Sequence, residues 1–465
     1  MTVRRERDTL GEVAVPADAL WGAQTQRAVE NFRISGYRAF PAFVRATVLV
    51  KKAAAHANAA AGRLEPELCE AISRACDEIL AGGHADQFVV DVFQAGAGTS
   101  HNMNANEVVA NRANELLGRP RGEYAPVGPN DQVNMAQSTN DVTPTAIRLA
   151  LLELTLPVCD ELERLADAFA AKAGEYADCV KPGRTHLQDA VPMTFGQEFG
   201  GWAARLVSAA ARIRAARAEL CELGIGGTAA GTGLNADPEF RGRVCRLLAE
   251  WTGEPIVPAK DLFAAMQSTA AFVRTSSAMR TAAIELSGIA NDIRLMVSGP
   301  RTGFGELLIP AVQPGSSMMP GKINPSIAEM VDQVCYQVIG NDTAVAFGAQ
   351  AGQLELNVMM PGMCFALCFS ATILANATRT LRERCVEGMR VDVARAKELL
   401  DASPPLLVTA LSPHIGYARS AALVKRALAE KRSLLEVALE ERVMPEADLR
   451  RVLDPLPMTR GGVQE

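Results

Sequence analysis

Residues 143–169 read TPTAIRLALLELTLPVCDELERLADAF, and this stretch decides the fold class. Thr143 is a typical N-cap, and Pro144 occupies a first helical position, where a backbone N–H is not needed. Apolar residues then recur in steps of three and four, which predicts one long helix. They are Ile147, Leu151, Leu154, Val158, Leu162, Leu165 and Phe169. A kink is expected at Pro157, because proline removes a helical hydrogen bond.

Four further segments carry the same apolar spacing and predict four more long helices. They cover about 194–223, the stretch beginning near Asp261, the stretch after Asn324-Pro325, and 356–378. Five long helices in the middle of a chain predict a helical bundle. Their apolar and Ala-rich faces are broader than the inner stripe of one bundle needs, so subunits are expected to associate through them.

The chain is expected to divide into three domains. Residues 1–137 mix turns with short helices, 138–391 hold the long helices, and from 392 to 465 the helices become shorter and more charged. No alternation of strand and helix is visible, which excludes a doubly wound sheet. The prediction is a mainly α-helical protein with an N-terminal, mainly helical domain, a central bundle domain and a small C-terminal helical domain.

Composition narrows the class of protein. The 465 residues are 48% hydrophobic but only 5% aromatic, which is too apolar for a disordered chain. Lys and Arg total 47 against 53 Asp and Glu, giving a net charge of −6, and no basic block favours nucleic acid. The ten Cys form no CxxC pair and no cluster with zinc spacing, so no metal ligands are predicted.

Location can also be predicted from the sequence. The opening MTVRRERDTLGE lacks the apolar segment of a signal peptide, and together with unpaired cysteines this predicts a cytoplasmic protein. The stretch 356–378 contains no charged residue, but it includes Asn357, Pro361 and Asn376, which a lipid-facing helix would disfavour. A buried helix of a large bundle is therefore the favoured interpretation over a membrane span.

Polar loops that are almost free of charge connect the long helices. They cover 95–106, 137–141, 183–189, 224–235 and 315–324. Loops rich in hydroxyls, amides and backbone N–H groups beside helix starts can bind an anion. The last reads GSSMMPGKINP over 315–325, which first suggests a nucleotide-binding P-loop. That interpretation fails, because five residues separate Gly315 from Gly321 and Ile323 replaces the required Ser or Thr.

The loop at 315–325 instead resembles the signature of the aspartase/fumarase superfamily. Other segments resemble that family's conserved regions: GAGTSHNMN at 96–104, QSTND at 137–141, GRTHLQDA at 183–190, GTGLN at 231–235 and GQLELNV at 352–358. The resemblance covers nearly the whole chain. It implies a three-domain helical lyase whose central helices assemble into a homotetramer, with each active site shared by three subunits.

The resemblance also implies the chemistry. Members of the family eliminate across a C–C bond of a dicarboxylate and release fumarate, through an aci-carboxylate that preorganised donors must stabilise. Ser316 would be the base, and His186 with its acidic partner Glu329 would complete the catalytic group. The implied substrate-binding residues are Gly98, Thr99, Ser138, Thr139, Asn140, Thr185, His186, Ser317, Lys322 and Asn324. No cofactor and no nucleic-acid or membrane partner is implied, and activation by a divalent metal ion stays open.

Within the superfamily the sequence shows mixed features. WGAQTQR at 21–27 resembles the class II fumarases, whereas QSTND at 137–141 and Gly122-Glu123-Tyr124 resemble the branch that eliminates ammonia from L-aspartate. Gly128 stands where class II fumarases carry a histidine before Pro-Asn-Asp. Elimination of ammonia from L-aspartate is therefore the predicted reaction, with fumarate hydration as the alternative.

A non-catalytic structural protein on the lyase fold is the remote third interpretation, disfavoured because Ser316, Lys322, Asn324 and His186 are all present. Three other histidines, His56, His84 and His101, are interpreted as structural.

Overall fold

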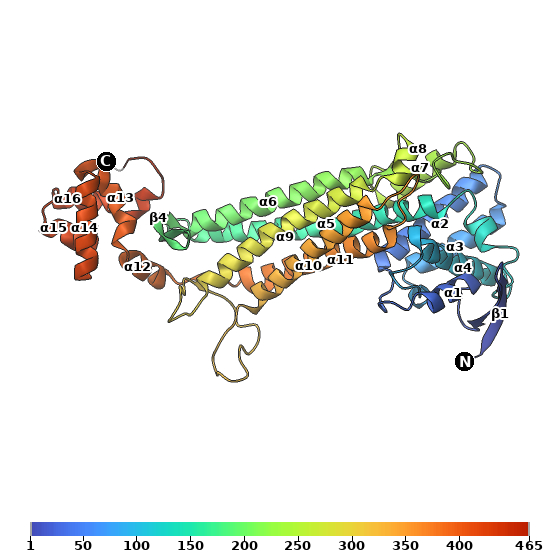
Figure 1. Ribbon diagram of the computed structural model, residues 1–465, viewed down its shortest axis with the longest axis horizontal. Coiled ribbons are helices and arrows are strands. Elements are labelled where there is room, and N and C mark those ends of the chain that lie inside the picture. Colours follow the sequence, from blue (N-terminus) through green and yellow to red (C-terminus); the bar gives the residue numbers. More distant parts are fainter. Residues whose placement is uncertain (1, 464–465) are drawn as a thin grey trace. The chain divides into compact units, whose positions relative to one another are not determined.

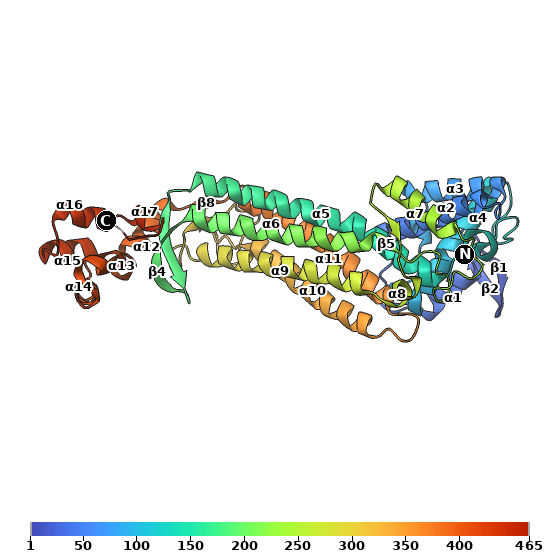
Figure 2. The same cartoon turned by 90° about the horizontal axis from the view of Figure 1, so that it is seen from above.

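The computed structural model describes residues 2–463 and is mainly helical, as predicted. Five long helices dominate the middle of the chain: α5 (Thr139–Glu175), α6 (Phe195–Leu220), α9 (Ala270–Met296), α10 (Ser326–Gln350) and α11 (Met360–Leu381). The structure divides into two compact units, and segments of all five helices belong to each. Within each unit these segments run side by side (Figures 1 and 2).

Several elements differ from the prediction. Most of the predicted loop at 95–106 is helical, since α4 (Thr99–Leu116) begins at Thr99, and most of the predicted loop at 183–189 belongs to the hairpin of β3 (Val180–Thr185) and β4 (Gln188–Thr194). The helix predicted over 356–378 begins at Met360.

Helix α5 begins at Thr139, one turn before Thr143, because two side chains cap it earlier. Asn140 N–H donates to Ser138 Oγ at 3.2 Å, and Ser138 N–H donates to Asp141 Oδ1 at 2.9 Å. The helix near Asp261 is split into α8 (Leu262–Gln267), which Asp261 caps, and α9. α5 continues through Pro157 as one element.

Unit 1 comprises Met1–Asp160, Ala210–Ala283 and Val334–Ala375. It contains the antiparallel hairpin β1–β2 (Val3–Asp8, Gly11–Pro16), the short parallel pair β5–β6 (Glu222–Leu223, Val257–Pro258) and, besides α8, five smaller α-helices among the described residues. These are α1 (Ala23–Asn31), α2 (Pro41–Ala60), α3 (Pro66–Leu80), α4 (Thr99–Leu116) and α7 (Phe240–Thr252). Aliphatic and alanine side chains of α2, α3 and α4 pack into one core.

Unit 2 comprises Glu161–Ala209, Ile284–Gln333 and Asn376–Glu465. Its hairpin β3–β4 (Val180–Thr185, Gln188–Thr194) and the short pair β7–β8 (Leu307–Leu308, Arg390–Val391) are antiparallel. The C-terminal helices are α12 (Val393–Asp401), α13 (Pro404–Ile415), α14 (Tyr417–Glu430), α15 (Leu434–Glu440), α16 (Glu446–Val452) and α17 (Pro455–Met458). Helices α13 to α16 share a hydrophobic core of their own. The division into three domains stays a prediction, since each compact unit combines separate stretches of chain.

Two helical stretches are long and apolar enough to cross a membrane by length and composition, Thr139–Glu175 and Met360–Val386. Within the most apolar part of each, 78% and 56% of the residues are buried inside the protein. Core helices of large proteins pass the same test, so these helices are weak evidence for a membrane span.

Candidate active site

The first group of predicted site residues lies where α4 and α5 begin, in unit 1. Gly98 precedes Thr99, the first residue of α4, and has a left-handed φ of +85°. A Cβ atom on Gly98 would lie 3.0 Å from Thr143 Oγ1. Glycine therefore lets the start of α4 approach α5 closely, which brings Asn102 on α4 within hydrogen-bond distance of Thr139 on α5.

A buried hydrogen-bond network supports this group, and we call it the α4–α5 cluster: Lys51, Asn102, Asn134, Gln137 and Thr139. Lys51 Nζ donates to Asn134 Oδ1 at 2.8 Å and to Gln137 Oε1 at 3.0 Å. Asn102 Nδ2 donates to Asn134 Oδ1 at 3.3 Å and to Thr139 Oγ1 at 3.1 Å. Lys51 is fully buried, and this burial lowers its pKa to about 7. The network thus connects a buried lysine to a predicted substrate-binding hydroxyl.

Asp141 joins a second polar loop to the same group. Its buried carboxylate accepts from Gly226 N–H at 3.0 Å and Thr228 N–H at 2.9 Å, in addition to Ser138 N–H. Burial raises the pKa of Asp141 to about 6 despite these donors. Asn140 Nδ2 donates to Ala229 O at 2.8 Å. The loops at 137–141 and 224–235, both predicted to bind an anion, are therefore held together.

The second group lies at the tip of hairpin β3–β4, in unit 2. Thr185 ends β3 and His186 begins the turn, and both are exposed. His186 and Leu187 have φ values of 55° and 59°. Two successive left-handed residues define a type I′ turn, which usually contains Asn or Gly. Residues with strained backbone dihedral angles are common at functional sites, so the turn agrees with a functional role for His186.

A buried ion pair fixes the base of that hairpin. Arg184 Nη1 and Nη2 donate to the two carboxylate oxygens of Glu306 at 2.9 and 3.2 Å, and the Glu306 side chain is fully buried. The ring of Phe304 lies 4.2 Å from the Arg184 guanidinium carbon. A bidentate pair of this kind has a fixed geometry. It therefore orients the strand that leads to Thr185 and His186.

The third group is the loop at 315–324, also in unit 2, with α10 following it. Ser316 Oγ accepts hydrogen bonds from Met318 N–H at 3.1 Å and Met319 N–H at 2.9 Å. Asn324 Nδ2 donates to Gly315 O. A Cβ atom on Gly315 would lie 1.8 Å from Lys322 O, so the two ends of the loop meet at a distance that only glycine permits.

This loop has the properties that a serine base requires. Two N–H donors on Ser316 Oγ stabilise its deprotonated form more than its neutral form, because hydrogen bonds to an anion are stronger. Lys322 is exposed and has no ion-pair partner among residues 2–463, so its charge is available to an anion. Ser317 is exposed in the same loop, and Glu329 is half-buried in the first turn of α10.

The structure therefore arranges the predicted residues as three separate groups. One group lies in unit 1 and two lie in unit 2. Within the described part of unit 2, no hydrogen bond or ion pair joins His186 to Glu329. Sequence reasoning missed Lys51, because VLVKKAAA reads as ordinary helix and burial of its ammonium depends on tertiary packing. No signal in one sequence identifies such a lysine.

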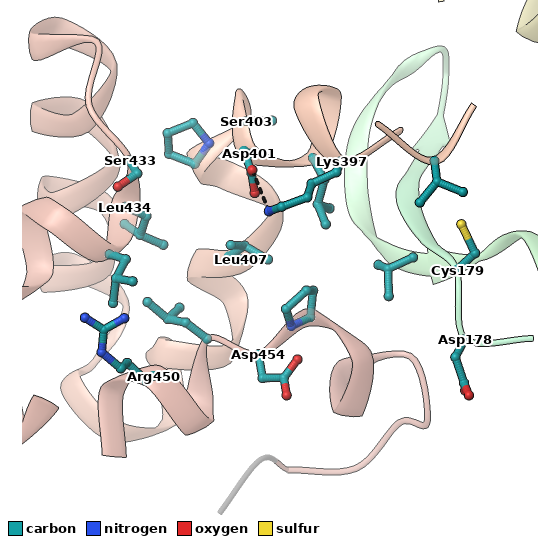
Figure 3. Close-up of a pocket in the computed structure, with 17 residues that line it drawn as sticks. Asp178, Cys179, Lys397, Asp401, Ser403, Leu407, Ser433, Leu434, Arg450 and Asp454 are labelled. Atoms are coloured by element: carbon teal, nitrogen blue, oxygen red, sulfur yellow. Dashed lines mark hydrogen bonds and ion pairs between the residues drawn. The ribbon is translucent and has the colours of Figure 1, made fainter. Parts of the chain in front are cut away.

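A pocket in unit 2 contains none of the predicted site residues (Figure 3). It has a volume of about 680 Å³ and is lined by β3, α12, α13 and the later C-terminal helices. Lys397 pairs with Asp401 at 2.8 Å, and Arg450 donates to Glu446 at 2.9 Å. The two cations that line the pocket are therefore already paired with carboxylates, which makes the pocket a poor receptor for a dicarboxylate. In the part of the chain that the structure describes, no three His, Cys, Asp or Glu side chains converge as a metal site.

Comparison with known proteins connects these groups to a family. The family model described as "Lyase" matches residues 11–340, and "Fumarase C C-terminus" matches 407–460. An aspartate ammonia-lyase of a Bacillus species is 45% identical, over 99% of this chain and 98% of the relative. A class II fumarate hydratase of Chromobacterium violaceum is 49% identical, over 94% of this chain and 95% of the relative.

A solved structure extends this similarity to three dimensions. The fumarate lyase:delta crystallin from Brucella melitensis bound to cobalt is 50% identical and has a TM-score of 0.95, covering 98% of this chain and all of that one. The similarity includes each of the three groups described above, since it runs along almost the entire sequence. The chain therefore belongs to the lyase family that includes aspartate ammonia-lyases and class II fumarate hydratases.

Proposed function

We propose that the protein is an aspartate ammonia-lyase, which converts L-aspartate reversibly into fumarate and ammonia. The observation that carries the proposal is similarity to an aspartate ammonia-lyase along 99% of the chain, with a serine in the signature loop whose Oγ accepts two backbone N–H groups.

The reaction needs only groups that the protein supplies. Deprotonated Ser316 removes a proton from the aspartate carbon beside the β-carboxylate, and the electron pair moves into that carboxylate to form the dianionic aci-carboxylate. Lys322 and Asn324 stabilise the added charge. The electron pair then forms the C=C bond of fumarate while the C–N bond breaks, and the substrate ammonium leaves as neutral ammonia. Ser316 afterwards returns its proton to solvent.

The remaining groups bind and orient the substrate. Hydroxyls of Ser138, Thr139 and Thr185 are suited to hold carboxylates, and Thr99 can join them by releasing its hydroxyl from Gly96 O. Asn140 and His186 can accept from the ammonium. Glu329 would fix the tautomer of His186. A class II fumarate hydratase is the second candidate, because a relative of that name is 49% identical. Gly128 argues against it, since this position provides no imidazole before the turn Pro129–Val133.

Separate assays with L-aspartate and L-malate distinguish the two candidates. Purified protein should produce the ultraviolet absorbance of fumarate from L-aspartate and little from L-malate. The reverse result would replace ammonia-lyase with fumarate hydratase. Fumarate from neither substrate would reject both and favour the non-catalytic interpretation.

We also propose that the enzyme is a cytoplasmic homotetramer in which three chains build each site. Within unit 2, His186 makes no hydrogen bond or ion pair with Glu329 or with the loop at 315–324, and Lys322 has no ion-pair partner among residues 2–463. Large apolar side chains are exposed on long helices that a monomer would leave in water, including Val207 (54% exposed), Ile284 (52%) and Phe347 (67%). Sedimentation should therefore give a particle of four chains, and an active monomer would contradict the shared site.

A further inference from the structure

Lys51 is a buried cation without an ion-pair partner among the described residues. Its side chain is fully buried in α2, yet no carboxylate within the described residues lies at ion-pair distance. Lys181 provides the contrast, because its buried ammonium pairs with Glu198 at 2.6 Å. Burying a cation without a counter-ion costs free energy. The buried Asp141 carboxylate offsets part of this cost without touching Lys51, and the rest suggests that a ligand supplies further negative charge.

The direction of each hydrogen bond in the α4–α5 cluster follows from Lys51. An ammonium can only donate, so Asn134 and Gln137 must turn their amide oxygens toward it. Asn134 Oδ1 also accepts from Asn102, which fixes the orientation of the Asn102 amide group. The same Asn102 nitrogen then donates to Thr139 Oγ1. Thr139 therefore uses its oxygen as an acceptor toward the interior, and its hydroxyl proton remains to be donated to a ligand.

Ser138 is oriented in the same way. Its Oγ accepts from Asn140 N–H, so its proton is also available to a ligand. Both hydroxyls lie at the amino-terminal end of α5, where the helix dipole favours negative charge. The nearby carboxylate of Asp141 is occupied by the three backbone N–H groups of Ser138, Gly226 and Thr228.

We propose that Lys51 is a positioning residue of an anion receptor at the start of α5. Through Asn134 and Asn102 it orients the Thr139 hydroxyl as a donor to one carboxylate of the dicarboxylate, and it supplies the buried countercharge for that carboxylate. The ligand class rests on the proposed function. The receptor itself does not depend on whether an amine or a hydroxyl group leaves the substrate.

The receptor should couple anion binding to proton uptake. In the empty site, burial holds the pKa of Lys51 near 7, while Asp141 and the Cys76 thiol act in the opposite direction. His101, on α4, stays neutral because burial lowers its pKa to about 3. A bound carboxylate favours the charged ammonium and raises the pKa of Lys51. Affinity should therefore be highest below pH 7 and should fall as pH rises above it, with up to one proton taken up on binding.

Calorimetric titration with succinate tests the proposal on the full-length protein, because this saturated dicarboxylate cannot be turned over. Lys51→Met keeps the length of the side chain and removes its charge and donors. We expect it to bind succinate about tenfold more weakly or worse and to lose the fall in affinity between pH 7 and 9. The matched control is Lys52→Met on the same helix, whose ammonium pairs with Asp77 at 2.6 Å near the surface. Its binding should equal that of the parent.

Parental affinity and parental pH dependence in Lys51→Met would overturn the proposal. If that variant does not fold, the parent protein decides, because titration in two buffers of different ionisation enthalpy measures proton uptake directly. No uptake between pH 7 and 9 would overturn the proposal as well. Fumarate from malate instead of aspartate would reject the proposed function, and the succinate result would still stand or fall independently.

Discussion

The α4–α5 cluster and the loop at 315–324 are built in opposite ways. In the cluster, Lys51 and Asn102 are buried, and the amide orientations are fixed by an ammonium that can only donate. In the loop, Met318 is 87% exposed and Ile323 is 53% exposed, and the side chain of Lys322 contacts no carboxylate within residues 2–463. The cluster is a buried network whose donors are already oriented, whereas the loop is exposed and makes few contacts through its side chains.

The difference suggests a division of labour between binding and chemistry. A buried network loses little entropy when a ligand arrives, because its donors are already oriented. An exposed loop with glycine at both ends can open for substrate and close over it. Under the proposed function, changes in the loop should reduce turnover more than binding, whereas changes in the cluster should weaken binding.

Ser316→Ala should have the largest effect. Removing the base should lower kcat by a factor of about 10³ to 10⁴, the usual contribution of general acid–base catalysis or more. Fumarate absorbance measures turnover, and calorimetry with succinate measures binding, which should change by less than about threefold because Ser316 donates to no carboxylate in the proposed mechanism. Activity within tenfold of the parent would show that another group is the base.

Gly315→Ala should have the next largest effect, and Gly321→Ala is its matched control. A methyl group on Gly315 would collide with Lys322 O, which must then move with the whole loop. Displacing a catalytic group by about 1 Å costs on the order of a hundredfold in kcat/KM. Gly321 has a φ of +80° but open space around its Cβ position, so alanine there adds only backbone strain of about 1 kcal/mol. Equal losses in both variants would mean that closure of the loop ends is unimportant.

The long helices could be predicted from the sequence, whereas the exact start of α5 could not. The long helices could be predicted because apolar side chains recur at helical spacing over twenty residues or so. The start of α5 could not, because Ser138 and Asp141 cap it through contacts that also involve the distant loop at 224–235. Pro144 is tolerated near the helix start, where one hydrogen bond is lost.

The site shows the same limit. Motifs predicted Ser316 and Thr139 as functional residues, and these assignments stay predictions. Their hydrogen-bond partners were not predictable, because Lys51 and Met319 N–H become relevant only through tertiary contacts. The turn at His186 and Leu187 also escaped prediction, since neither residue favours a left-handed φ. Sequence identifies the groups, and packing decides how each is oriented.

The smallest predicted effect concerns the stability of the buried region in acid. Thr47 donates its hydroxyl proton to Phe43 O at 2.8 Å, so its oxygen can only accept from His101 Nε2, at 3.1 Å. His101 also stacks on Phe43, with ring centroids 4.4 Å apart. This arrangement suits a neutral imidazole, and burial lowers the pKa of His101 to about 3. The structural interpretation of this histidine is thereby given a physical basis.

The sign of the pH effect follows from comparing folded and unfolded chains. An unfolded histidine takes up its proton near pH 6.5, whereas folded His101 does not until about pH 3. His101 therefore destabilises the fold as pH falls below 6.5, by about 2 kcal/mol at pH 5. Asp141, with its pKa raised to about 6, acts in the opposite direction over part of this range.

A comparison of the parent with a His101 variant separates the effect of His101 from that of Asp141. Denaturant unfolding at pH 7 and pH 5, at one protein concentration, should show the parent losing about 2 kcal/mol more than His101→Gln, whose amide can still donate to Thr47. If both proteins lose the same free energy, protonation of His101 is not the source of the acid sensitivity, and the buried region tolerates a charged imidazole at this position.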